Sequence, residues 1–198
     1  MNFLAHIYLS NDNPYLQIGN FIADFIKANR FTHLPIPIQQ GIFLHRQIDA
    51  FTDAHPIVKQ SKRRLHNRYR HYNGIIIDIF YDHFLAKNWH TYHKTPLADY
   101  TQSFYKLLQY NPNYLPTPVK KFLTYLINDN WLLNYAEIDG IEKTLVGMNK
   151  RTQLKSQMHL AIADLNLHYS DFESDFTAFF ENLCTFSAEK IKTITNNK

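Results

Sequence analysis

Two carboxylates four residues apart stand inside an apolar segment of the chain. The stretch GIIIDIFYDHFLA (74–86) is rich in Ile, Phe and Leu, yet it contains Asp78 and Asp82, with His83 adjoining. On a helix, residues four apart lie about 40° from each other around the axis, so both carboxylates face one side. A buried carboxylate without a partner is strongly unfavourable, so a cation is expected to face the pair. That cation is either an arginine or a metal ion.

A second segment repeats this spacing with a histidine. In GIFLHRQIDAFTDAHP (41–56), His45, Asp49 and Asp53 recur every fourth residue, and Arg46 lies at the edge of the same side. A histidine and an aspartate one turn apart can reach one ion because their Cβ atoms are about 5–6 Å apart. The segment therefore predicts two ligands for a metal.

A third acid, Asp24 in GNFIADF, also stands in an apolar segment. Imidazole and carboxylate ligands without thiolates suit Mn²⁺, Fe²⁺, Mg²⁺ or Zn²⁺ in a hydrolytic site. The single cysteine, Cys184, excludes a disulfide scaffold and a thiolate zinc site, and it fits a reducing compartment. Packing alone is a poor explanation for three acid-bearing apolar segments.

One segment is strongly basic, although the net charge is only +4 and the pI is near 9. This segment, KQSKRRLHNRYR (59–70), contains no acid. It predicts either a solvated helix face or a surface for a polyanion: nucleic acid, an anionic membrane or an acidic protein. Its cations are Lys59, Lys62, Arg63, Arg64, Arg68 and Arg70.

The elements that must position these side chains are helices. Glycine is scarce, and Pro14, Pro56, Pro96 and Pro118 stand where helices would begin. No repeat, low-complexity tract or domain linker interrupts the chain, so we expect an all-α, single-domain helical bundle over residues 1–198. Apolar spacings of three and four predict helices over 14–29, 36–54, 56–70, 74–91, 96–109, 117–135, 138–150, 153–168 and 171–194.

The beginning of the chain does not read as a targeting segment. MNFLAHIYLSNDNPY lacks a charged region before its apolar run, and that run is interrupted by His6. No apolar stretch approaches the roughly 20 residues of a membrane span. We therefore expect a cytoplasmic protein without a membrane partner.

Four motifs, in this order and spacing, carry a family resemblance: MNFLAHIYLS, GNFIADFIK, GIFLHRQIDAFTDAHPIVKQSKRRL and YNGIIIDIFYDHFLAKNW. Together they resemble acyl carrier protein phosphodiesterase. The resemblance is close over the first half of the chain and looser beyond, where GIEKTLVGMNKR (140–151) also fits. It implies removal of 4′-phosphopantetheine from holo-acyl carrier protein, with a divalent cation, manganese favoured. It also implies a distant relation to the HD-domain metal phosphohydrolases, and so an HD-domain-like bundle.

The site follows from this resemblance combined with helix geometry. The HD signature has an adjacent His-Asp pair, whereas this chain has Asp82-His83 in the reverse order, so its ligands cannot be copied from HD enzymes. Arg46 is expected to stabilise phosphoryl charge, and His83 or His71 to protonate the leaving serine oxygen. The expected metal ligands are Asp24, His45, Asp49, Asp78 and Asp82.

Three residues are left with two interpretations each. His6 is either a further ligand or a hydrogen-bonded core histidine, whereas Asp53 and His55 either belong to the site or sit at a helix end. The basic segment is expected to dock the acidic acyl carrier protein.

Two other functions compete with this interpretation. A nucleic-acid-binding protein would use the basic segment but leave the buried acids without a purpose, so no nucleic-acid partner is expected. An HD-like phosphohydrolase acting on a nucleotide or another small phosphodiester would share the metal site and need no docking helix.

Overall fold

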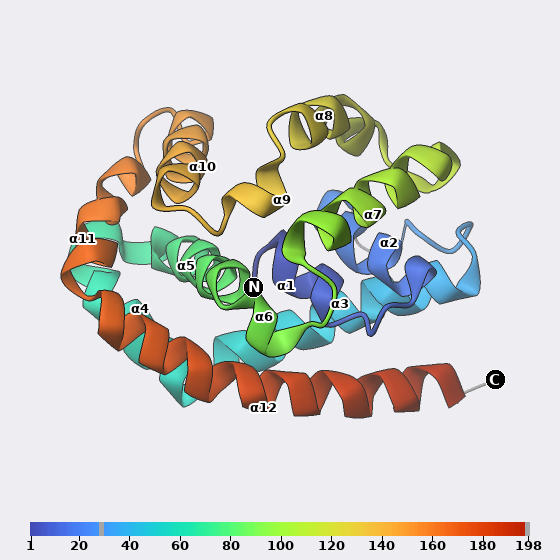
Figure 1. Cartoon of the computed structure of the whole chain (residues 1–198), viewed down its shortest axis with the longest axis horizontal. Coiled ribbons are helices and arrows are strands. Elements are labelled where there is room, and N and C mark those ends of the chain that lie inside the picture. Colours follow the sequence, from blue (N-terminus) through green and yellow to red (C-terminus); the bar gives the residue numbers. More distant parts are fainter. Residues whose placement is uncertain (28–29, 197–198) are drawn as a thin grey trace.

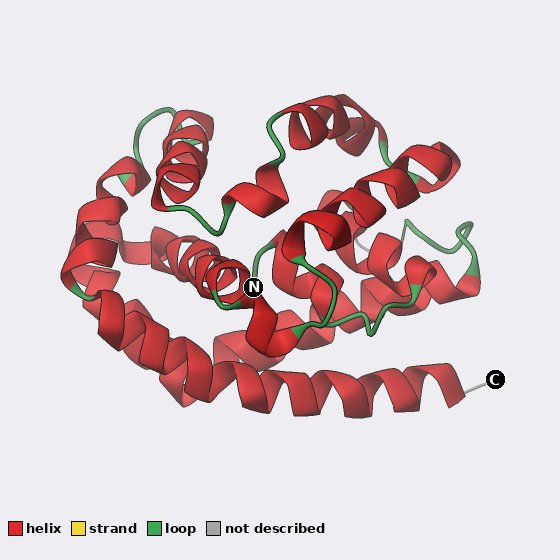
Figure 2. Cartoon of the chain, viewed as in Figure 1, coloured by secondary structure: helices red, strands yellow, loops and turns green. Residues whose placement is uncertain are grey.

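The structure, a computed structural model, describes residues 1–27 and 30–196, and these residues form helices and loops without strands (Figures 1 and 2). The all-α prediction is confirmed. The α-helices are α1 (Phe3–Tyr8), α2 (Pro14–Ile22), α3 (Ile36–Ala54), α4 (Pro56–Tyr69), α5 (Asn73–Lys87), α6 (Trp89–Tyr92), α7 (Leu97–Tyr110), α8 (Thr117–Asn128), α9 (Trp131–Asn134), α10 (Ile138–Arg151), α11 (Ala161–Leu167) and α12 (Tyr169–Asn196). Short 3₁₀ turns are η1 (Ala23–Phe25), η2 (Arg70–Tyr72), η3 (Pro112–Tyr114) and η4 (Met158–Leu160).

Four predicted segments are shorter or divided in the structure. The segment 14–29 ends its α-helix at Ile22, and residues 28–29 lie outside the described residues. The segment 74–91 stops at Lys87, and 117–135 divides where Asn130 takes a left-handed conformation (φ 44°). The segment 153–168 begins with a turn and the 3₁₀ turn η4, and its α-helix, α11, starts only at Ala161.

Helix α5 lies at the centre of the bundle, which explains its apolar sequence. Ile76, Ile77, Phe80, Tyr81 and Phe84 are all buried. The long α12 crosses α3, α4 and α5, whereas α1 and α10 contact other parts of α5 (Figure 1). With neighbours on several sides, α5 can bring a polar side chain to a site only where one of those neighbours supplies a partner.

Helices α2 and α3 pack backbone against backbone. A Cβ atom on Gly19 would lie 2.9 Å from the Cα of Gly41, and one on Gly41 would lie 2.5 Å from the carbonyl oxygen of Leu16. Side chains of any size would hold the two helices apart. This contact brings the end of α2 and the turn after it against the middle of α3, where His45 lies.

Candidate metal centre

Two buried histidines and one aspartate converge at the meeting point of α1 and α3. His6 of α1 and His45 of α3 stack with their ring centroids 4.0 Å apart. Asp49 lies one turn after His45, and its two carboxylate oxygens are 3.2 Å from Nε2 of His6 and 3.1 Å from Nε2 of His45. One ligand atom from each of the three residues lies within 4.8 Å of the others, so this group could hold a metal ion.

The surroundings of His45 orient its ring for such a role. Its Nδ1 donates to the carbonyl oxygen of Asn20 at 2.8 Å, which turns Nε2 toward Asp49 and toward Asp24, 3.1 Å away. A histidine fixed through one ring nitrogen by a backbone carbonyl is the usual arrangement behind a metal ligand. Nε2 facing two carboxylates must carry either a proton or a cation, so the residues fit a divalent ion.

Burial and the neighbouring charges shift the pKa values of the two histidines in opposite directions. Burial opposes a charge on His45, but hydrogen bonds from its ring to Asp24 and Asp49 raise its pKa to about 9. Burial and the neighbouring His45 lower the pKa of His6 to about 4. Although burial opposes its charge, Asp49 has a pKa below the usual range because both histidines bond to it.

His6, whose role was left open, therefore belongs to the cluster. Its Nε2 also lies 3.1 Å from the carbonyl oxygen of Met1, and its buried Nδ1 has no hydrogen-bond partner among the described residues. Asn20 supports the helix that carries it by donating to the His6 carbonyl at 2.7 Å.

Asp78 and Asp82 both face the N-terminal segment, as their shared helix side predicts, but they have different partners there. Asp78 lies 3.1 Å from the Met1 amino group, which is 3.7 Å from Asp49. Asp82 is fully buried and accepts from the backbone N–H groups of Leu4 at 2.7 Å and Ala5 at 3.3 Å. Burial raises the pKa of Asp82 to about 7 and also raises that of Asp78.

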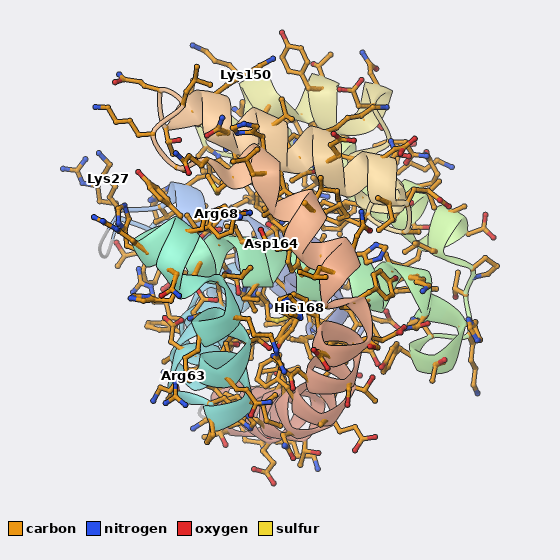
Figure 3. All side chains as sticks on the ribbon, turned by 90° about the vertical axis from the view of Figure 1, so that its left-hand side faces the viewer. Lys27, Arg63, Arg68, Lys150, Asp164 and His168 are labelled. Carbon is orange, nitrogen blue, oxygen red and sulfur yellow. The ribbon has the colours of Figure 1, made fainter. Side chains whose placement is uncertain are left out.

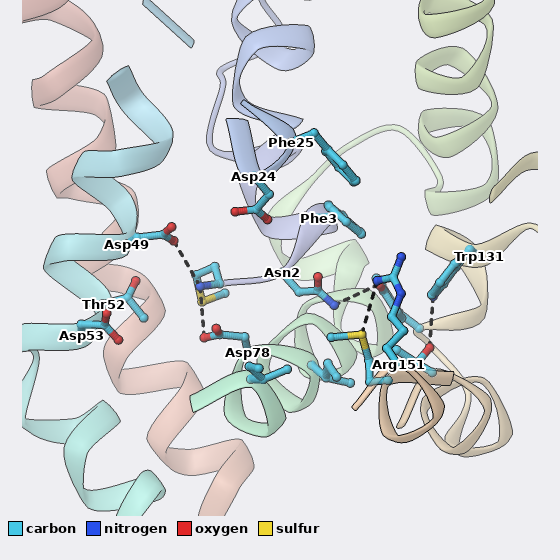
Figure 4. Close-up of a pocket in the computed structure, with 16 residues that line it drawn as sticks. Asn2, Phe3, Asp24, Phe25, Asp49, Thr52, Asp53, Asp78, Trp131 and Arg151 are labelled. Atoms are coloured by element: carbon cyan, nitrogen blue, oxygen red, sulfur yellow. Dashed lines mark hydrogen bonds and ion pairs between the residues drawn. The ribbon is translucent and has the colours of Figure 1, made fainter. Parts of the chain in front are cut away.

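A pocket of about 420 Å³ opens beside the cluster (Figure 4). Asp24, Asp49, Asp53 and Asp78 line one end, and the other end is lined by aromatic rings and by residues of α10. Asp82 is not among the described residues that line this pocket.

The predicted proton donors and phosphoryl-binding residue do not meet at this pocket. His83 is buried elsewhere, with its ring nitrogens 2.8 Å from the Tyr135 carbonyl and 2.8 Å from the Tyr169 hydroxyl. His71 is exposed and lies against Tyr72. Arg46 places its guanidinium over the ring of Phe31 and is not among the described pocket-lining residues.

The two remaining open residues lie at helix ends. His55 caps α4, because its Nδ1 accepts from the backbone N–H of Ile57. Asp53 lines the pocket but is largely exposed and pairs with Lys62 at 2.6 Å. This ion pair places the middle of α4 at the edge of the pocket.

Three of the six cations of the basic segment form ion pairs with acidic residues of the same chain. Besides Lys62, Arg64 pairs with Asp175, and Arg68 pairs with Asp164 at 3.1 Å. Figure 3 shows Arg68 beside Asp164, whereas Arg63 points outward at the edge. The other predicted docking residues, Lys59, Arg63 and Arg70, are exposed.

Arg151 and Trp131 are among the pocket residues that were not singled out from the sequence. Arg151 is the basic side chain among the described residues that line the pocket, and Trp131 belongs to its aromatic end. Arg151 closes the motif GIEKTLVGMNKR, which fits the family and was the available signal. No comparable signal pointed to Trp131.

Comparisons with known proteins point to one family. The sequence model described as acyl carrier protein phosphodiesterase matches residues 1–183. A protein of that name from Photorhabdus laumondii is 33% identical over 186 residues, covering 91% of each chain. Proteins of the same name from Enterobacter sp. strain 638 and Salmonella agona are 31% and 30% identical, each over 96% of this chain and 99% of their own.

No solved structure matches the chain, so the HD-domain-like relation stays a prediction. Among the described residues, no helix has both the length and the apolar character needed to cross a bilayer.

Proposed function

The chain belongs to the acyl carrier protein phosphodiesterase family, and we propose that it hydrolyses the phosphodiester joining 4′-phosphopantetheine to the serine of holo-acyl carrier protein. The reaction consumes water: a bond from water oxygen to phosphorus forms, and the bond from phosphorus to the serine oxygen breaks. The products are apo-acyl carrier protein, with its serine hydroxyl restored, and free 4′-phosphopantetheine.

The observation that carries the proposal is the cluster of His6, His45 and Asp49, which lies beside the acidic end of a pocket and contributes Asp49 to its lining. A phosphodiester is an anion and would be repelled by this end unless a cation were bound there. We assign the divalent ion to these three residues, with Asp24 as a fourth ligand, and Mn²⁺ as the favoured ion. When bound, it supplies Lewis acidity that neutralises phosphoryl charge and makes a nearby water more acidic.

The protein's own groups orient the reaction. His45 is held in place by Asn20, and Asp24 and Asp49, which both face its Nε2, would hold the ion. Asp78 lines the pocket beside the cluster, and burial raises its pKa. We therefore assign proton transfer at the water or at the leaving serine oxygen to Asp78, in place of His83 or His71.

The test is mass spectrometry of holo-acyl carrier protein incubated with the enzyme and Mn²⁺. We expect loss of the phosphopantetheine mass with the unaltered chain and with His66→Ala, an exposed control. With His45→Ala or Asp49→Ala we expect a loss of at least 100-fold in rate, together with lower metal content by elemental analysis.

Hydrolysis of nucleotides or other small phosphodiesters with holo-acyl carrier protein left intact would overturn the proposal in favour of a different phosphohydrolase. Full activity of the folded Asp49→Ala variant would instead overturn the assignment of the metal site.

A further inference from the structure

The pocket has two chemically different ends. Its acidic end is lined by Asp78 and by Asp24 and Asp49 of the proposed metal ligands, whereas the far end is formed by aromatic side chains and α10 (Figure 4). Its volume of about 420 Å³ is within the range of roughly 300 to 1,000 Å³ of small-molecule sites. A phosphate group bound at the proposed metal ion would occupy only the acidic end.

Three rings of a connected set, Phe3, Phe25 and Trp131, line the far end. Phe3 stacks on Phe25 with centroids 6.2 Å apart, and both contact Phe122. Phe122, which is not among the described lining residues, makes a T-shaped contact with Trp131 at a centroid distance of 5.0 Å and so connects the lining rings. Each ring is only partly buried, although its neighbours fix its position, so the wall presents rigid apolar surface to a ligand.

Hydrogen-bonding groups stand among these apolar side chains. The Trp131 indole is anchored by donating to Thr144 at 3.1 Å. Asn2 donates to the Tyr135 hydroxyl at 3.0 Å, and both residues line the pocket. The exposed Arg151 guanidinium has a weak contact with the Met148 sulfur at 3.7 Å, which leaves N–H groups to reach a ligand.

We propose that this far end is the binding site for the pantetheine arm of the substrate, with the aromatic wall against its gem-dimethyl and methylene groups and Arg151 donating to its amide carbonyls. This inference rests on the proposed function, because it takes the arm from the proposed substrate. The arm is a flexible chain with alternating apolar and amide groups, and it leads directly away from a phosphate. A pocket with ion ligands at one end and rings interspersed with donors at the other matches that order of groups.

The chain contains its own reporter for this site. It has two tryptophans, and Trp89 is buried away from the pocket against Tyr8 and Tyr100. In the Trp89→Phe variant, tryptophan fluorescence therefore comes from Trp131 alone. Titration with reduced pantetheine in EDTA tests the arm without phosphate, metal or catalysis, and calorimetry on the unaltered chain repeats the measurement without that substitution.

We expect saturable pantetheine binding with a change in Trp131 emission, and tighter binding of 4′-phosphopantetheine when Mg²⁺ is present. Inorganic phosphate should leave the emission unchanged. Arg151→Ala and Phe25→Ala should each weaken pantetheine binding about tenfold. Their matched controls are Lys150→Ala, in the same exposed last turn of α10, and Phe43→Ala, an exposed ring outside the pocket; both should bind as the parent does.

The inference is overturned if pantetheine fails to bind in both measurements, or if Arg151→Ala and Phe25→Ala bind it as tightly as their controls do. Those outcomes leave the proposed function standing when holo-acyl carrier protein is still cleaved. Conversely, arm binding at Trp131 without cleavage of holo-acyl carrier protein would support the arm site and reject the proposed function.

Discussion

At the scale of single residues, His45 determines how the metal-free cluster responds to pH. Its pKa is raised from 6.5 to about 9 in the folded protein. Folding therefore favours the protonated ring, and the resulting stability is fully present below pH 6.5 and is lost as pH rises through about 9. His6, with its pKa lowered to about 4, stays neutral over this range.

We accordingly expect the melting temperature of the EDTA-treated protein to fall between pH 6.5 and 9, measured by differential scanning fluorimetry. The raised pKa of the Met1 amino group acts in the same direction near the top of this range, so the informative quantity is the difference from His45→Gln. That variant should show a shallower decline, whereas the exposed control His66→Gln should keep the parent slope. Identical slopes for all three proteins would contradict the role given to His45.

Asp82 holds the first turn of α1, which carries His6. Asn2 makes no side-chain capping bond at this helix end, so Asp82 supplies the acceptor for Leu4 and Ala5. Asp82→Ala should lower the free energy of unfolding by about 2 kcal/mol, because it leaves two N–H groups unpaired. Asp82→Asn keeps one acceptor oxygen, so it should retain metal and most of its activity, in contrast to Asp49→Asn. Loss of metal from a stable Asp82→Asn protein would restore Asp82 as a ligand.

Sequence spacing alone could group His45 with Asp49, and both lie in the cluster. It could also place Asp78 and Asp82 on one side of a helix, but not assign their partners. Those partners lie in the N-terminal segment, more than 70 residues away along the chain. His83 shows the same limit, since its bonds to Tyr135 and Tyr169 depend on how distant helices pack.

At the scale of helices, the predictions were best where proline and long apolar periodicity coincide. The segment 36–54 matches α3 at both ends, and α4 begins at Pro56 as predicted. Helix α1 was not predicted because it has only six residues and is capped by a distant side chain. The division at Asn130 depends on a single left-handed residue, which apolar spacing does not reveal.

The contact between α2 and α3 is the element-scale feature on which the cluster depends. A methyl group at Gly41 would meet backbone atoms of Leu16 and Asn20, so α2 would have to move. Asn20 holds the His45 ring, and Asp24 follows on the same segment.

We expect Gly41→Ala to lower the free energy of unfolding by about 1–3 kcal/mol and to weaken metal binding, measured by chemical denaturation and by metal titration. Gly147→Ala is the matched control, because a Cβ atom there meets no atom of the described residues within 4 Å. Because position 147 is exposed and helical, the Gly147→Ala substitution should raise the free energy of unfolding by up to about 1 kcal/mol. It should leave metal binding unchanged. Equal metal affinity in Gly41→Ala would show that the helix contact does not position the cluster.

At the scale of the whole molecule, the basic helix α4 contributes to the fold as well as being the predicted docking surface. Arg64 and Arg68 join α4 to α12 and α11 through Asp175 and Asp164, so they contribute to the fold. Ser61 also donates to Asp175, which makes Arg64 part of a partly buried network. Lys59 and Arg63 are exposed, whereas Lys62 is held at the edge of the pocket by its ion pair with Asp53. The surface left to meet an acidic protein is therefore smaller than the six cations in the sequence suggest.

We expect Lys59→Glu/Arg63→Glu to raise KM for holo-acyl carrier protein about tenfold or more at low salt and to flatten its salt dependence, with kcat nearly unchanged. The physical reason is that exposed charges govern the encounter with an acidic partner, whereas the proposed reacting groups lie in the pocket. The control pair is Lys120→Glu/Lys121→Glu, which makes the same change in net charge on exposed residues of α8. Helix α8 lies on the other side of the bundle from α4 (Figure 1), so this pair should change KM much less. Steady-state kinetics over a range of salt concentrations measures both pairs. Equal effects of the two pairs would mean that overall charge, and not α4, attracts the carrier protein.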